Sequence, residues 1–186
     1  METDDRINLL ARVARSPGAA KGTSGSTSIL TLAAASYGAK VTDDSTVPTG
    51  FDPNAARLFE ALVEGAYLVA SADGVIDESE RHTFEKVVAA ASGGIVTEEQ
   101  VTALVGDLAD ELAEDGLDKR LQAIGERATT RPQAEEVLRV AALLAQVSEN
   151  VSDVERGVLV KLAAACHLSP ADVDAAVDAV KKSLAG

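Results

Sequence analysis

Residues 66–81 read AYLVASADGVIDESER, and this stretch contains the pattern that decides the fold class. Its first residues continue an apolar helical pattern, and Asp73-Gly74 ends it, because glycine permits a bend that a helix cannot make. Asp77 is then a good N-cap for a second helix, and Glu80, three residues later, completes a capping box. The stretch therefore predicts two helices joined by a tight acidic turn.

A second stretch, residues 141–156, reads AALLAQVSENVSDVER and aligns with the first without gaps. In this alignment Glu155 falls on Glu80 and Arg156 falls on Arg81. The two stretches are followed by similar helix openings, TEEQV at 97–101 and SPADV at 169–173. We interpret this as an internal duplication of a unit that consists of a helix, an acidic turn, a capped helix, a loop and another capped helix.

Working outward, apolar residues recur at helical spacing through the rest of the chain, with a cap or a proline at most helix starts. We expect helices over about 52–71, 77–91, 97–112, 118–128, 130–149, 152–166 and from 169 onward. No segment alternates apolar and polar residues as a strand does. The sequence predicts an all-α class: a single compact domain of two related helical repeats with about seven to eight helices.

The first fifty residues carry weaker signals. Residues 5–15 and 29–37 have helical spacing, and residues 21–28 between them are small and polar, as in a linker. We expect 1–50 to be a partly mobile N-terminal appendage and 51–186 to be the domain.

Composition restricts the possible functions. Hydrophobic residues make up 46 % of the chain but aromatics only 3 %, with no Trp, so the core must consist mainly of Ala, Val and Leu. The formal net charge is −13, and all of it comes from residues 51–186. An acidic domain without basic clusters argues against binding to nucleic acid and to anionic membrane surfaces.

Location follows from what the sequence lacks. Cys166 is the only cysteine, so no disulfide can form within the chain, which suits a reducing compartment. No run approaches the roughly 18 apolar residues of a membrane span, and the N-terminus lacks a signal-peptide pattern. We expect a cytoplasmic protein without direct membrane insertion.

The acidic turn has the spacing of the second half of an EF-hand loop. With Glu80 at the last position, Asp77 lies three residues earlier and Gly74 lies at the sharp bend, with Ile76 as the apolar anchor. The first half does not fit, because Val69 occupies the opening ligand position. The same residues also form an ordinary turn and capping box without any ion, so both readings stay open.

The segment ADGVIDESER at 72–81 resembles the hallmark of the TerB-like tellurite-resistance family, and 148–156 with 168–170 resembles its second repeat. This resemblance implies a helical domain that chelates a divalent metal, such as Ca²⁺, Mg²⁺, Mn²⁺ or Zn²⁺, with acids of both repeats. The implied ligands are Asp73, Asp77, Glu80, Glu149, Asp153 and Glu155. The second turn departs from the pattern, because Ser148-Glu149-Asn150 replaces Asp-Gly.

The resemblance also implies a non-enzymatic protein that engages other proteins, including membrane-associated assemblies, in the response to tellurite and other chemical stress. Two alternatives stay open: a metal-dependent hydrolase that uses clustered carboxylates, and a structural interaction domain without an ion. His82, four residues after Glu78, is a candidate ligand, although a helical histidine is more often solvated. Cys166 continues an apolar stripe, as a core residue does.

Overall fold

The computed structural model describes residues 3–16, 27–39, 51–74, 76–148 and 151–185, and every regular element in these ranges is helical. The all-α class is therefore confirmed. These ranges hold nine α-helices and one 3₁₀ helix, η1, against the seven to eight helices expected. They are α1 (Thr3–Arg15), α2 (Ile29–Gly38), α3 (Pro53–Ala70), α4 (Glu78–Ala91), α5 (Glu98–Asp115), α6 (Leu117–Arg127), α7 (Arg131–Leu144), η1 (Ala145–Ser148), α8 (Asp153–Ala165) and α9 (Pro170–Ala185).

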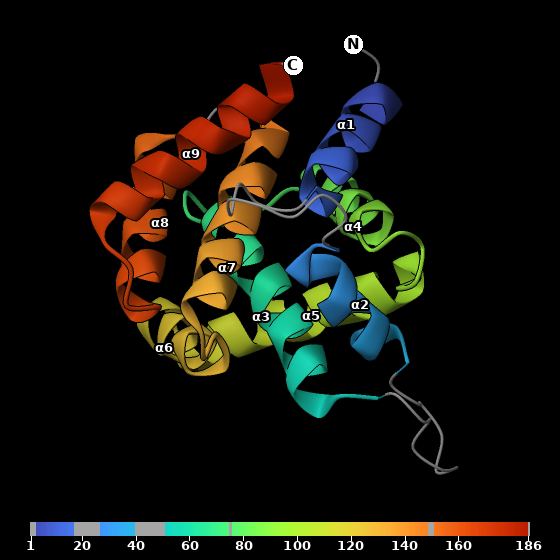
Figure 1. Ribbon diagram of the computed structural model, residues 1–186, viewed down its shortest axis with the longest axis horizontal. Coiled ribbons are helices and arrows are strands. Elements are labelled where there is room, and N and C mark those ends of the chain that lie inside the picture. The colour runs from blue at the N-terminus through green and yellow to red at the C-terminus, as the bar shows by residue number, and fades with distance from the viewer. Residues whose placement is uncertain (1–2, 17–26, 40–50, 75, 149–150, 186) are drawn as a thin grey trace.

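The helix α3 runs through the middle of the molecule and packs against α2 and α7, and also contacts α5, α6 and α8 (Figure 1). Its apolar residues cover nearly the whole helix surface, and Phe59 and Leu62 are completely buried. Small residues let the neighbours approach closely. At Gly65 an added Cβ would lie only 3.2 Å from Val137 Cγ1 of α7. Close packing of small residues thus fills a core in which aromatic residues are few.

The helices α1 and α2, within the segment 1–50 that we expect to be an appendage, contribute buried residues to the core, and the division of the chain at residue 50 stays a prediction. Leu10 of α1 and Leu30 of α2 are buried, and α1 packs along α4 while α2 packs on α3. Arg139 of α7 donates hydrogen bonds to the carbonyls of Val13 and Ala14, at 3.1 and 2.8 Å, and so satisfies the C-terminal end of α1. Residues 17–26 and 40–50, which include most of the expected linker, lie outside the described residues.

The helix α7 ends at Leu144, whereas the apolar spacing predicts that it continues to about Glu149. The chain tightens into η1, as the last turn of a helix often does. The carbonyl of Gln146 in η1 accepts a hydrogen bond from Arg6, which attaches the start of α1 to this end of α7. In the described ranges, no helix has both the length and the apolar character needed to cross a bilayer.

The two repeats share their capping geometry. Asp77 and Glu80 form a reciprocal capping box at the start of α4, and Ser152 and Glu155 form one at the corresponding start of α8. The duplicated register also places Thr102 of α5 and Asp174 of α9 in matching positions.

Matching arginines reach toward these two positions. Arg156 of α8 pairs directly with Asp174, whereas Arg81 of α4 is joined to Thr102 through the carboxylate of Glu85. The packing partners differ, since α4 packs on α1 and α5 while α8 packs on α6, α7 and α9.

Candidate functional site

The acidic turn begins where α3 ends. Ser71 caps the helix by donating its hydroxyl hydrogen to the carbonyl of Tyr67 at 2.8 Å. Gly74 then takes a φ of +147°, a value that other residues rarely adopt. Asp73, next to it, is exposed. The turn is therefore shaped by its backbone and by glycine.

Asp77 and Glu80 are engaged with one another's backbone. Asp77 Oδ1 accepts from the backbone N–H of Glu80 at 2.8 Å, and Glu80 Oε2 accepts from the backbone N–H of Asp77 at 3.1 Å. Within the described residues, the second oxygen of each carboxylate accepts no hydrogen bond. The capping-box reading of the sequence is confirmed.

The second turn places its acids in a similar way. Glu155 accepts a hydrogen bond from the backbone N–H of Ser152 at 2.6 Å and is only 5 % exposed. Asp153 is exposed at the first position of α8, where its charge is favourable near the helix N-terminus. Glu149 lies outside the described residues.

The predicted metal ligands that the structure describes follow α3 and α7, and these two helices pack side by side (Figure 1). Among the residues that the structure describes, no three His, Cys, Asp or Glu side chains are grouped so that they could hold a metal ion. An ion at either turn would have to share Asp77, Glu80 or Glu155 with the caps. Metal binding by the six acids stays a prediction of the resemblance.

A groove of about 940 Å³ lies beside the acidic turn, between the first half of α4 and the start of α5. It is open to solvent and is lined by Ile76, Glu78, Ser79, Arg81, His82, Glu85 and Thr102. The sequence predicts that Ile76 is an apolar anchor that points into the core. It is only half-buried and forms part of the apolar wall of this groove. The groove therefore joins an apolar contact to charged groups.

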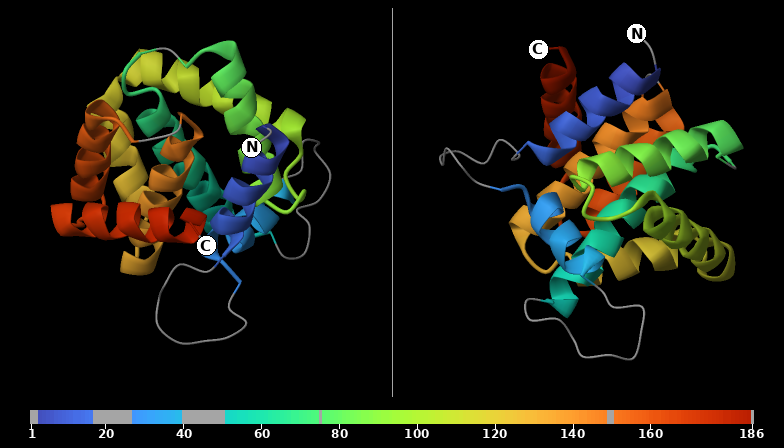
Figure 2. Two further views of the ribbon diagram at one scale, coloured as in Figure 1. Left: turned by 90° about the horizontal axis from the view of Figure 1, so that it is seen from above. Right: turned by 90° about the vertical axis from the view of Figure 1, so that its right-hand side faces the viewer.

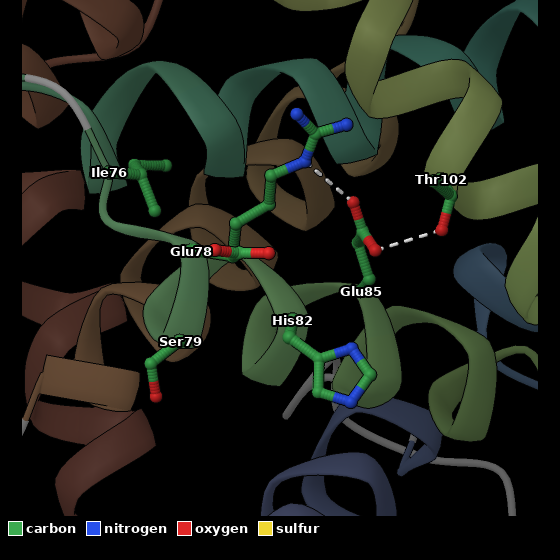
Figure 3. A pocket seen from close by; sticks show the side chains of 7 residues that line it. Ile76, Glu78, Ser79, His82, Glu85 and Thr102 are labelled. Carbon is green, nitrogen blue, oxygen red and sulfur yellow. Dashed lines mark hydrogen bonds and ion pairs between the residues drawn. The ribbon is translucent and has the colours of Figure 1, made fainter.

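Glu85 fixes the geometry of the groove. The residue is 7 % exposed, and its two carboxylate oxygens accept hydrogen bonds from Arg81 Nε and Thr102 Oγ1, both at 2.8 Å (Figure 3). In Figure 3 His82 and Ser79 are directed away from these bonds. One buried carboxylate thus ties α4 to α5 and leaves the imidazole of His82 accessible.

The outer side of α5 is an acidic surface. The helix contains no Lys or Arg. At about 100° per residue, four exposed acids lie within an arc of about 80°. Within the described part of the chain none of the four has an ion-pair partner; they are Glu99, Asp107, Asp110 and Glu114. We call these four residues the α5 acidic face. The stripe was not predicted from the sequence, although the spacing of these acids contains it.

A buried ion-pair network lies at the other end of α5 and has a structural role. Glu64 of α3, 1 % exposed, accepts hydrogen bonds from Arg120 Nε at 2.5 Å and from Arg127 Nη1 at 3.0 Å. Burial raises the pKa of Glu64, and the hydrogen bond from Arg120 opposes that rise. Arg120 Nη2 also lies 2.5 Å from Glu111 Oε2, an ion pair by distance, although the N–H direction does not make it a hydrogen bond. With every charge compensated, the network joins α3, α5 and α6.

Cys166 is buried, and this burial raises the pKa of its thiol to about 11, so it stays protonated at neutral pH. The expectation of a core residue is confirmed by its burial.

Comparisons of the chain with protein-family models, with curated proteins and with solved structures find no match. What the fold and the site define is an all-α domain of two related repeats with a groove beside its first acidic turn. The TerB-like resemblance of residues 72–81 stays a prediction.

Proposed function

We propose that this chain is a non-enzymatic interaction domain that binds a basic segment of another protein along α5 and in the groove beside the acidic turn. The observation that carries the proposal is the α5 acidic face, whose four exposed carboxylates have no ion-pair partner in the described part of the chain. Repulsion among like charges on one helix is unfavourable, and a cationic partner would relieve it.

The groove supplies the contact that charge alone does not. Ile76 offers an apolar surface at one end, and the bonds of Glu85 to Arg81 and Thr102 hold the floor rigid before any partner binds. A preorganised site loses less conformational entropy on binding. The partner segment would place an apolar side chain against Ile76 and Lys or Arg side chains along α5.

The biological setting is part of the same proposal. The resemblance of 72–81 to the TerB-like family supports a role in the response to tellurite or other chemical stress, with a component of a membrane-associated assembly as the partner. A cytoplasmic location and a divalent ion at the acidic turns are further parts of that proposal.

The test is affinity capture with the full chain and with a variant whose α5 charge is neutralised by Glu99→Gln, Asp110→Asn and Glu114→Gln. A control variant loses the same charge at exposed acids on α1 and α9, by Asp4→Asn, Asp5→Asn and Asp178→Asn. We expect partners captured by the wild-type chain to be retained by the control, lost by the α5 variant, and released as salt rises. Equal capture by all three proteins would contradict the proposal.

A further inference from the structure

The exposed face of α8 carries apolar side chains, although the formal net charge of the chain is −13. The described residues expose four large hydrophobic side chains, and two of them, Val154 at 52 % and Val160 at 37 %, lie on this helix. Gly157 lies between them, and no atom lies within 4 Å of the place where its Cβ would be. Figure 2, in its left view, shows α8 at the margin of the molecule, on the side away from α1 and α4. Among the described elements none covers Val154, Gly157 and Val160, which are all exposed.

Charged and apolar groups on this face are placed symmetrically about Gly157. Asp153 precedes the glycine by four residues and Lys161 follows it by four, while Val154 precedes it by three and Val160 follows it by three. Each charge therefore lies about 6 Å along the helix axis from the glycine, on the same side of the helix. Two identical helices packed antiparallel with their glycines opposite would bring each Asp153 level with the partner's Lys161 across the contact line.

We propose that α8 is a self-association surface, on which a second copy of this chain binds antiparallel about a two-fold axis at Gly157. A two-fold interface uses the same surface on both copies and must be self-complementary, and this face meets that requirement in charge. The missing side chain at Gly157 lets the two helix backbones approach closely.

Charge selects a second copy over other occupants. A net charge of −13 makes most of the surface repel another copy, but Asp153 and Lys161 balance one another here. Lys161 has only one partner within the described chain, Asp118 at 3.5 Å, and both side chains are largely exposed. An ion pair of that kind contributes little, so Lys161 can exchange it for the partner's Asp153.

The size of the surface sets the strength of the dimer. One helix face covers less than the roughly 800 Å² per partner of a standard interface. A groove of about 410 Å³ between α6 and α8, which Lys161, Ala164 and Leu121 help to line, adjoins the face and can receive side chains from the other copy. We expect a dimer with a Kd in the micromolar range.

Sedimentation equilibrium of the full chain tests the proposal. Lys161→Glu places a carboxylate at position 161 of each copy opposite Asp153 of the other, so two negative pairs face one another across the axis. Asp153→Lys creates two positive pairs in the same way. Each substitution should raise the dimer Kd about 10-fold or more. An equimolar mixture of these two variants should associate again, because both pairs in the mixed dimer are then attractive. Gly157→Gln, with open space around it, should weaken the wild-type dimer without disturbing the fold, which circular dichroism checks. Lys181→Glu, an exposed change of equal charge on α9, is the control and should leave the Kd within about two-fold.

The proposal is overturned if the wild-type chain stays monomeric up to about 1 mM, where even weak contacts populate a dimer. It is also overturned if Lys161→Glu and Gly157→Gln leave the Kd unchanged, or if mixing the two charge variants does not restore association.

Discussion

The packing of α6 against α8 is sensitive to a single methyl group at Gly125 of α6. An added Cβ would lie 2.1 Å from the carbonyl oxygen of Ala165 and 2.9 Å from its carbon, whereas ordinary contact begins at 3.4 Å. The obstacle is backbone at the end of α8, so α6 and α8 would have to separate by more than an ångström. Overpacking of this kind costs about 3 kcal/mol, and the better helix propensity of alanine returns about 1 kcal/mol. We expect Gly125→Ala to lower the free energy of unfolding by about 2 kcal/mol.

Gly157→Ala is the matched control, because it is the same substitution in the interior of a helix with no atom within 4 Å of the new Cβ. It should raise stability by about 0.5–1 kcal/mol. Urea unfolding followed by circular dichroism, at one dilute protein concentration, measures the free energy of unfolding of both variants. In thermal unfolding, the Tm of Gly125→Ala should fall by about 4–8 °C relative to the wild type. Equal stabilities of the two variants would refute the close crossing of α6 and α8.

Three further predictions concern single positions. His167, at a φ of 59° just after α8, occupies a left-handed conformation that favours glycine, so His167→Gly should raise stability by about 1 kcal/mol in the same urea assay; a loss of stability would contradict this. Hydrogen bonds from Ser169 lower the pKa of Asp172 below 3.8, so its contribution to stability is present above pH 3.8 and is lost as pH falls through the lower folded pKa. When the pH is lowered below 4, the Asp172→Asn variant should therefore lose less stability than the wild type, as Tm measured against pH will show. Identical Tm profiles of the two proteins would exclude a contribution of ionised Asp172 to stability. The double variant Asp77→Ser, Glu80→Gln keeps a capping box but removes both negative charges. If the acidic turn binds an ion, Ca²⁺, Mg²⁺, Mn²⁺ or Zn²⁺ should raise the Tm of the wild type and leave the Tm of the variant unchanged. Equal Tm shifts in the two proteins would exclude Asp77 and Glu80 as ligands.

Helix starts are predictable from this sequence because each depends on residues within one turn. The capping boxes at Thr97–Gln100 and Asp77–Glu80 are examples, and both form as the pattern indicates. The docking of α1 is not predictable in this way. Arg139 binds the carbonyls of Val13 and Ala14, which lie more than 120 residues earlier in the chain, and no local pattern contains that contact.

The site was predictable only in part, for a similar reason. A glutamate such as Glu64 within an apolar helix indicates a buried partner, but the chain has 17 Lys and Arg residues, and only the packing selects Arg120 and Arg127. Arg81 and Glu85 have the spacing of a helical ion pair, yet the groove exists because Thr102 approaches from α5. Local acidic patterns are visible in the sequence, whereas the surfaces they form depend on how helices pack.

The central claim is that the α5 acidic face and its groove recognise a basic segment. Its most direct test is a selection of displayed random peptides on the full chain, followed by anisotropy titrations of the selected peptides. The claim predicts peptides that combine Lys or Arg with an apolar residue and bind the Glu99→Gln, Asp110→Asn, Glu114→Gln variant at least about 10-fold more weakly than the wild type, which corresponds to about 1.4 kcal/mol. Selected peptides without basic residues, or peptides that bind both proteins equally, would contradict it.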